Sequence, residues 1–313
     1  MPLQVVPPAT APEFDVTAVN TAHHRRYRWN DGGREIEIAI SDSGRPGPAW
    51  LLLPALSTIS SRSEWEPFCE ALLESCQRNR SPLPRLIRID WPGFGESDRP
   101  RLPYDAALLA RFLADFRRVV CLADCGLIAA GHSAGIALLA AQRHGLAFRE
   151  WILVAPTWRG PLPTMAGRRR RAFSALRSLV EAPLLGPLLY RLNTSKGMLG
   201  WMSRRHVDVA GSGLTPEGIA TRQRIARQSG ARFASAAFVT GGLDPYATPD
   251  GWLSAAAALQ SPLTVVIADQ APPKSLAAMQ ALAAVADRTL HLSGRLGAHE
   301  EGGRDLAALL SRC

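Results

Sequence analysis

Lysine is nearly absent from this sequence: Lys196 and Lys274 are the only two among 313 residues, and arginine supplies the remaining basic side chains. Long apolar runs are absent as well, since none approaches the roughly 18 to 20 residues that cross a bilayer. Residues 1–22 are rich in proline and alanine and lack the basic start and apolar core of a secretory signal. We therefore expect a loose leader over residues 1–26 and a cytoplasmic protein.

Cysteine is too sparse and too irregularly spaced for a disulfide framework or a zinc site. Two of the five cysteines stand four residues apart, but no second pair completes a tetrahedral set of ligands. We predict small core residues or surface thiols, and neither a metal nor any other cofactor. The five are Cys69, Cys76, Cys121, Cys125 and Cys313.

The net charge of +9 is concentrated in one part of the chain. Residues 158–262 contain thirteen arginines and one lysine against five acidic residues, so this segment has a net charge of 14 − 5 = +9. The rest of the chain is therefore neutral overall. A composition of 47% hydrophobic and 20% charged residues is ordinary for a soluble globular protein.

The order of periodic segments predicts an α/β protein. Short runs typical of strands, some of them wholly apolar as in a parallel strand buried on both faces, alternate with helical patterns. This order favours a mostly parallel, doubly wound sheet with helices on both sides. Residues 34–40 alternate polar and apolar side chains, as an edge strand does, with residues 27–29 as a hairpin partner. The expected parallel strands are 49–53, 85–90, 127–130, 151–155, 263–267 and 289–292.

Residues 158–262 interrupt this alternation. The segment is nearly all helical in pattern, which predicts a helical cap inserted after the sixth strand, over the carboxyl ends of the strands where such sheets bind ligands. The predicted core is then 27–157 together with 263–313.

The sequence Gly-His-Ser-Ala-Gly at residues 131–135 follows a buried strand and precedes a helical pattern at 136–143. Such a G-x-S-x-G turn can present a serine hydroxyl at the end of a strand, where the amides of the next helix stabilise negative charge. We interpret Ser133 as a nucleophile. The structural alternative is a glycine-rich turn whose serine only caps the helix.

Together these segments resemble the α/β-hydrolase family, from about Tyr27 to the end of the chain. The resemblance is carried by the elbow at 131–135, by Asp90-Trp91-Pro92-Gly93-Phe94-Gly95-Glu96-Ser97, and by the loop Gly297-Ala298-His299-Glu300-Glu301. Asp90 itself is expected to tie its own turn together. The sequence is also similar to uncharacterised members from oxygenic phototrophs. The resemblance implies the α/β-hydrolase fold and a serine mechanism that needs a base, an acid and an oxyanion hole.

The family's order places the base after the last strand. His299 lies in that loop, which is about two residues longer than usual, whereas His291 lies within the strand. The usual acid position is occupied by Ala271. Asp269 is the first candidate for the acid and Asp244, at the end of the cap, is the second. A dyad without an acid is the third interpretation.

The oxyanion hole is expected to use the backbone amides of Ala134 and Leu56, each of which can contribute roughly 3 kcal/mol. Trp158, just after the sixth strand, is expected to lie at the mouth of the site and to bind substrate. An apolar wall above Ser133 favours a hydrophobic small molecule as the substrate.

The cap has two interpretations of equal weight. Its apolar helix faces and its arginines fit an interfacial lid that touches an anionic membrane. They also fit helices that pack on the core with solvated arginines. Nucleic acid is not expected as a partner, because the sequence has no recognition motif and no row of aromatic residues.

Two function classes follow. The first is a serine hydrolase that cleaves a carboxylic ester of a hydrophobic molecule through an acyl-enzyme (class EC 3.1.1). The second is a non-hydrolytic lipid- or pigment-binding member of the fold, suggested by Ala271 and by Pro54-Ala55 where the family has His-Gly. A lyase or perhydrolase that uses the same residues is a third, since fold does not fix reaction.

Overall fold

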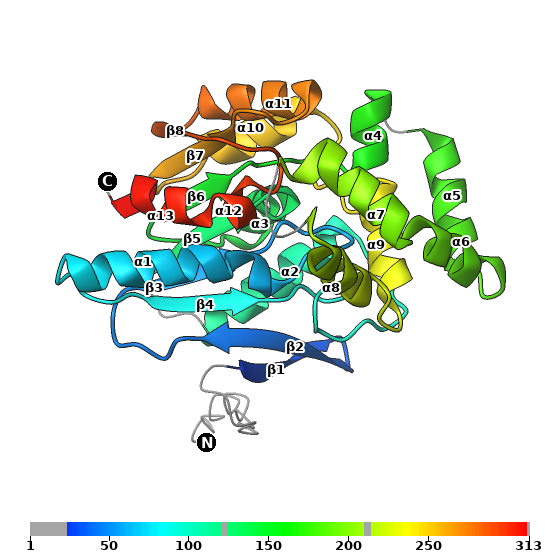
Figure 1. Ribbon diagram of the computed structural model, residues 1–313, viewed down its shortest axis with the longest axis horizontal. Coiled ribbons are helices and arrows are strands. Elements are labelled where there is room, and N and C mark those ends of the chain that lie inside the picture. Colours follow the sequence, from blue (N-terminus) through cyan, green and yellow to red (C-terminus); the bar gives the residue numbers. More distant parts are fainter. Residues whose placement is uncertain (1–23, 121–123, 169, 210–213, 312–313) are drawn as a thin grey trace, which may run out of the picture.

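The computed structural model describes residues 24–120, 124–168, 170–209 and 214–311. Its centre is one eight-stranded sheet in the order β1-β2-β4-β3-β5-β6-β7-β8 (Figure 1). All neighbours from β4 to β8 are parallel, and β1 and β2 form an antiparallel edge. The strands are β1 (His24–Asp31), β2 (Arg34–Asp42), β3 (Ala49–Leu53), β4 (Arg85–Ile89), β5 (Cys125–Ala130), β6 (Trp151–Val154), β7 (Leu263–Ala268) and β8 (Arg288–Leu292).

The predicted fold is confirmed. The expected runs form the parallel strands, and β5, β6 and β7 are buried along their whole length, because helices cover both faces of the sheet. The predicted hairpin is formed by β1 and β2, but β1 starts at His24, three residues before the expected start of the core. Of the predicted leader, residues 1–23 lie outside the described residues.

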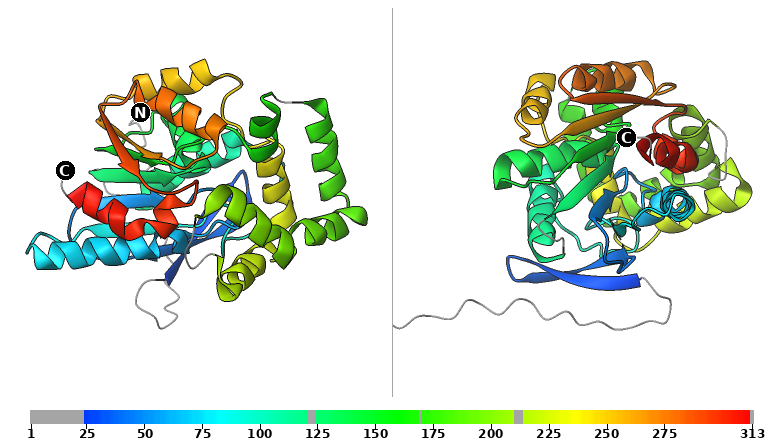
Figure 2. Two further views of the ribbon diagram at one scale, coloured as in Figure 1. Left: turned by 45° about the horizontal axis from the view of Figure 1, so that its top comes forward. Right: turned by 90° about the vertical axis from the view of Figure 1, so that its left-hand side faces the viewer.

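Helices of the core lie on opposite faces of the sheet, as the right-hand view of Figure 2 shows. One face carries α1 (Glu66–Arg78), α12 (Ala298–Glu301) and α13 (Gly303–Ser311); the short turn η1 (Arg62–Trp65) leads into α1. The other face carries α2 (Ala106–Val120) and α3 (His132–His144). A cluster of aromatic rings joins β1 to α2: Trp29 and Trp91 each pack edge-on against Phe112.

The segment between β6 and β7 is helical in its described part, as the sequence indicates. Its helices gather beyond the carboxyl ends of the parallel strands, on the right of Figure 1, except for α10, which packs on α3 and α11 (Pro273–Ala283). They are α4 (Pro161–Ala166), α5 (Arg171–Glu181), α6 (Leu185–Asn193), α7 (Lys196–Met202), η2 (Ser203–Val207), α8 (Pro216–Ala226), α9 (Ala231–Val239) and α10 (Pro249–Ala257).

Within the described residues, no single helix has the length and apolar character needed to cross a membrane. The pair α5 and α6 meets that test only jointly, and the two helices are bent by 106° relative to each other.

The loop after β4 shows why its glycines are required. The carboxylate of Asp90 accepts the backbone amides of Arg62 and Glu96, at 2.5 and 2.7 Å, and pairs with the Arg62 side chain. Gly95 has φ +55°, and a Cβ there would lie only 2.1 Å from the Asp90 side chain. Asp90 is therefore structural, as expected, and fastens β4 to the start of η1.

Candidate active site

The turn between β5 and α3 places its backbone strain on Gly131, not on Ser133. Gly131 has φ 52° and ψ −128°, a conformation that residues with a side chain rarely adopt. A Cβ at Gly131 would lie 2.9 Å from the carbonyl oxygen of Ala55. In a nucleophile elbow, the strained residue between strand and helix is the one whose side chain is presented for attack. Here that residue has no side chain.

Ser133 lies inside the helix. We expected helical structure only from residue 136, but α3 begins at His132, so Ser133 is its second residue. The side chain is 0% exposed. Its hydroxyl donates to the carbonyl of Pro54 and accepts a hydrogen bond from Nε1 of Trp91 at 2.8 Å. The single hydroxyl proton is therefore already used, and Ser133 makes no hydrogen bond to His299 in this structure.

Two backbone amides at the turn that could stabilise an oxyanion already donate to carbonyl groups of the chain. The amide of Ala134 donates to the carbonyl of Gly131 at 3.3 Å. If Gly131 is the elbow residue, the relevant amide is the next one, His132. That amide donates to the carbonyl of Ala55 at 3.0 Å, so the chain's own oxygen accepts the bond an oxyanion would need. Leu56, the other expected contributor, has φ +59° and is fully buried.

His299 does have a carboxylate partner, and it is neither of the two that we predicted. Its Nε2 lies 2.9 Å from Oε2 of Glu64, and the His299 residue is only 1% exposed. Glu64 comes from η1, 235 residues earlier in the chain. The same Oε2 accepts the amide of Ala55 at 2.9 Å, and Oε1 accepts the amide of Ser61 at 3.3 Å. Glu64 therefore orients the imidazole and also fixes the loop after β3.

The electrostatics favour an ionised Glu64. Burial raises the pKa of this carboxyl, but the hydrogen bonds from His299 and from the Ala55 amide outweigh burial, and the net pKa is below its ordinary range. Because an ionised carboxylate only accepts, Nε2 of His299 is the donor. The other ring nitrogen, Nδ1, is buried without a hydrogen-bond partner. An imidazole oriented by a carboxylate is therefore present, and no hydroxyl is bonded to its other ring nitrogen.

Asp269 pairs with a different histidine. Its Oδ1 lies 2.7 Å from Nδ1 of His291, and the two side chains are 48% and 62% exposed. This pair lies at the ends of β7 and β8 on the surface. The prediction that Asp269 orients His299 is therefore wrong, because Asp269 is bonded to His291 and the carboxylate bonded to His299 is that of Glu64.

Asp244 is a structural residue in the return from the cap. Its Oδ1 accepts the amide of Gly160 at 2.7 Å, and this bond joins the two ends of the inserted segment. Beside it, Nε2 of His132 donates to the carbonyl of Leu243 at 2.8 Å. Burial lowers the pKa of His132, against the opposing effect of Asp244, so a neutral ring is favoured. His132 thus anchors the end of the cap to the elbow, which gives this histidine a packing role.

The lengthened loop before His299 binds the cap. The amide of Gly297 donates to the carbonyl of Val207 at 2.8 Å. Arg222 in α8 pairs with Asp208 of the cap and with Glu300 of the core, the latter at 3.1 Å. The loop before His299 therefore supplies backbone bonds that hold η2 against it.

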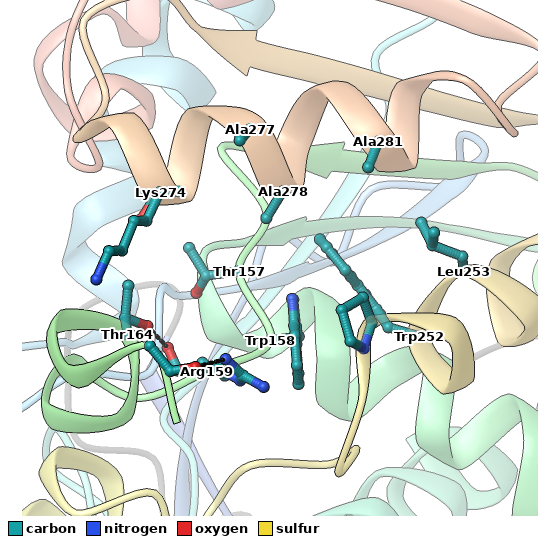
Figure 3. Close-up of a pocket in the computed structure, with 13 residues that line it drawn as sticks. Thr157, Trp158, Arg159, Thr164, Trp252, Leu253, Lys274, Ala277, Ala278 and Ala281 are labelled. Carbon is teal, nitrogen blue, oxygen red and sulfur yellow. Dashed lines mark hydrogen bonds between the residues drawn. The ribbon is translucent and has the colours of Figure 1, made fainter. Parts of the chain in front are cut away.

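Trp158 lines a cavity of about 370 Å³ between the start of the cap, α10 and α11 (Figure 3). Its ring lies 6.2 Å from that of Trp252, and the guanidinium of Arg159 lies 4.2 Å above it. Neither Ser133 nor His299 lines this cavity. We expected Trp158 at the mouth of the site around Ser133, but the cavity that it lines lies against α11 and does not include Ser133.

No group of three or more His, Cys, Asp or Glu side chains among the described residues is arranged to hold a metal ion.

A family model described as "Alpha/beta hydrolase family" matches residues 46–305, most of the chain. The chain belongs to the alpha/beta hydrolase family. A search of curated proteins finds no match.

Solved structures of alpha/beta hydrolases share this fold at low sequence identity. A probable hydrolytic enzyme from Pseudomonas aeruginosa PAO1 is 16% identical, with a TM-score of 0.65 and 95% of each chain covered. A thermophilic esterase from Thermogutta terrifontis is 20% identical, with a TM-score of 0.63, covering 92% of this chain and 97% of its own. A haloalkane dehalogenase from Agrobacterium tumefaciens C58 is 16% identical, with a TM-score of 0.62, covering 93% and 97%. These neighbours are hydrolases and, with the family match, support a hydrolase of this fold; at such identities each likeness by itself shows the fold.

Proposed function

We propose that this alpha/beta hydrolase family member binds an apolar or amphiphilic small molecule without hydrolysing it through Ser133. One observation carries the proposal: the strained position of the elbow is Gly131, and the serine two residues later is buried in α3 with both Trp91 and Pro54 bonded to its hydroxyl. A nucleophile needs a free hydroxyl within reach of its base. Ser133 has neither property in this structure.

The arrangement also opposes a simple side-chain rotation that would restore attack. Rotation would leave the buried Nε1–H of Trp91 and the carbonyl of Pro54 without partners, and each unsatisfied buried group costs about 1–3 kcal/mol. The Ala55 carbonyl would also have to release the His132 amide before that amide could stabilise an oxyanion. The geometry therefore supports a structural role for Ser133.

The cavity beside Trp158 is the proposed binding site. Its walls are two tryptophans and small apolar side chains of α11, which suit an apolar body. Two cations lie on its lining: Arg159 donates to the carbonyl of Gly167 at 3.1 Å, and Lys274 donates to the carbonyl of Met165 at 2.7 Å. Because the acceptors are neutral carbonyls, the positive charges suit an anionic group on the ligand.

Binding is tested with anilinonaphthalene sulfonate, an aromatic anion whose fluorescence rises in apolar sites. We expect saturable binding that weakens at least tenfold in Ala278→Phe, which fills the cavity from α11. Ala284→Phe, just past the end of α11 and not on the lining, is the matched control and should bind as the wild type does. Equal binding by Ala278→Phe and the wild type would refute this location.

Catalysis is tested separately with a fluorophosphonate probe and a series of p-nitrophenyl esters of increasing chain length. We expect no labelling above that of Ser133→Ala and no turnover by the wild type. Labelling that disappears in Ser133→Ala would overturn the non-hydrolytic proposal.

A second candidate function is the serine ester hydrolase, and the His299–Glu64 pair favours it. A buried, carboxylate-oriented imidazole with a ring nitrogen left open is the base of such a mechanism. In this candidate, the Ser133 oxygen would attack the carbonyl carbon and its proton would pass to His299, which then gives it to the departing alcohol. Water would hydrolyse the acyl-enzyme. The candidate requires Ser133 to leave both of its present hydrogen bonds, and serine labelling that is lost in His299→Ala would support it.

A further inference from the structure

Helix α6 presents apolar side chains on both of its faces. Gly186 and Tyr190 are buried against the rest of the cap. On the opposite side, four leucines are exposed to solvent: Leu184 by 88%, Leu185 by 58%, Leu188 by 57% and Leu192 by 62%. At 100° per residue these four lie within an arc of about 100°. A surface helix normally has polar residues on the face opposite the core, so this stripe needs a partner outside the described structure.

The neighbouring helix α5 continues the pattern. It has no fully buried residue, although its sequence is strongly amphipathic. Leu176 and Leu179 are exposed by 40% and 41% and stand one turn apart on the same side. The two helices contact each other and form the outer edge of the cap, away from the sheet, in Figure 1 and in the left-hand view of Figure 2.

The charge around these leucines is almost entirely positive. Residues 161–205 contain eight arginines and one lysine against Glu181, a net charge of 9 − 1 = +8. Glu181 is already paired with Arg177 at 2.6 Å within α5. Exposed cations stand at both ends of the helix pair: Arg170 and Arg171 before and at the start of α5, and Arg191 in the last turn of α6.

We propose that the apolar arm, defined as α5 and α6 with their exposed leucines, docks the protein on the surface of a membrane rich in anionic phospholipid. Exposed leucines would enter the boundary between head groups and acyl chains, and the flanking arginines would meet the phosphates. A second copy of the chain fits this surface poorly, because residues 170–193 have a net charge of 4 − 1 = +3 and two such positive arms would face each other. The bend of 106° between the helices suits an arm that lies on a surface.

The arm is not part of the cavity at Trp158 or of the elbow. Leu184, Leu185, Leu188 and Leu192 line neither site. Membrane docking is therefore independent of whether Ser133 reacts, and the two proposals fail separately.

The experiment is sedimentation of the full chain with vesicles of phosphatidylcholine alone or with about one-third phosphatidylglycerol. We expect binding to the anionic vesicles, little binding to the neutral ones, and release as salt rises. Leu184→Ser/Leu188→Ser should weaken the partition coefficient at least tenfold, since each leucine transfers a large apolar surface. Arg170→Gln/Arg171→Gln should weaken it about 25-fold, from about fivefold for each arginine.

Matched controls are Val285→Ser and Arg78→Gln, which change an exposed apolar and an exposed basic residue on the core. Both should bind vesicles as the wild type does, and all variants should keep the wild-type melting temperature, because the altered side chains are exposed. No binding of the wild type to anionic vesicles would overturn the proposal. Unchanged binding of the leucine variant would overturn it too. The proposal would also be overturned if the wild type formed a dimer that the leucine variant does not form and neither protein bound vesicles.

Discussion

Ser133→Ala separates the structural and catalytic interpretations of the elbow by stability alone. In the structure, the Ser133 hydroxyl joins three elements: it donates to Pro54 after β3, accepts from Trp91 after β4, and belongs to α3. All three residues are buried. Removing the hydroxyl deletes two hydrogen bonds and leaves an indole N–H and a carbonyl unsatisfied in a dry environment.

The expected cost follows from those two bonds. Each contributes about 1 kcal/mol net, and an unsatisfied buried donor or acceptor adds up to a few kcal/mol more. We therefore expect Ser133→Ala to lower the free energy of unfolding by about 2–4 kcal/mol, a large part of the 5–15 kcal/mol typical of a domain. A displayed nucleophile behaves in the opposite way, because its replacement by alanine commonly leaves stability unchanged or raises it.

The assay is equilibrium unfolding in urea, followed by tryptophan fluorescence and circular dichroism. Ser178→Ala, an exposed serine on α5, is the control and should stay within about 0.5 kcal/mol of the wild type. A double-mutant cycle of Ser133→Ala with Trp91→Phe should show a coupling of about 1 kcal/mol, since the two residues share one bond. A Ser133→Ala variant as stable as the wild type, with no coupling to Trp91, would refute the structural role.

Glu64→Gln should make the free energy of unfolding less dependent on pH below neutrality, because the pKa of Glu64 in the folded protein lies below its ordinary value near 4.5 and its ionised form stabilises the fold above that pH. In the wild type this stability is lost as the pH falls through the folded pKa. Urea midpoints from pH 3 to 7 measure the difference, and parallel profiles for the two proteins would contradict the prediction. Gly131→Ala should cost about 1–3 kcal/mol, because its positive φ and a Cβ 2.9 Å from the Ala55 carbonyl both oppose a side chain; a melting temperature equal to that of the wild type would show that the turn can relax. Asp269→Asn should change the free energy of unfolding by less than about 0.5 kcal/mol, because the contact between Asp269 and His291 is exposed to solvent. A loss above about 1 kcal/mol would contradict this prediction.

Much of the fold was predictable because it depends on local patterns. Apolar runs that alternate with helical patterns have few ways to bury their surfaces, and a doubly wound parallel sheet is the common one. The loop from Asp90 to Ser97 was recognisable for a similar reason: Gly95 must pack against the Asp90 carboxylate, so its residue types are fixed by a close approach.

The acid of the histidine could not be found in the same way. Glu64 and His299 are separated by 235 residues, and they meet because η1 and α12 lie against each other. In the sequence, Glu64 stands among several glutamates of an amphipathic segment, where solvent exposure is the ordinary expectation. Ser61 three residues before it was the only local signal, since a serine and a glutamate in that spacing often form a helix start.

The sequence by itself determined that the chain is an alpha/beta hydrolase with a basic helical insertion, because family motifs, periodicity and charge are properties of neighbouring residues. Only the tertiary structure decided the roles at the elbow. G-x-S-x-G states which residues are present, but the residue that carries the strain depends on where β5 ends against Ala55 and Val154. In this protein the strand ends at Ala130, so Gly131 makes the turn and Ser133 is buried beneath it.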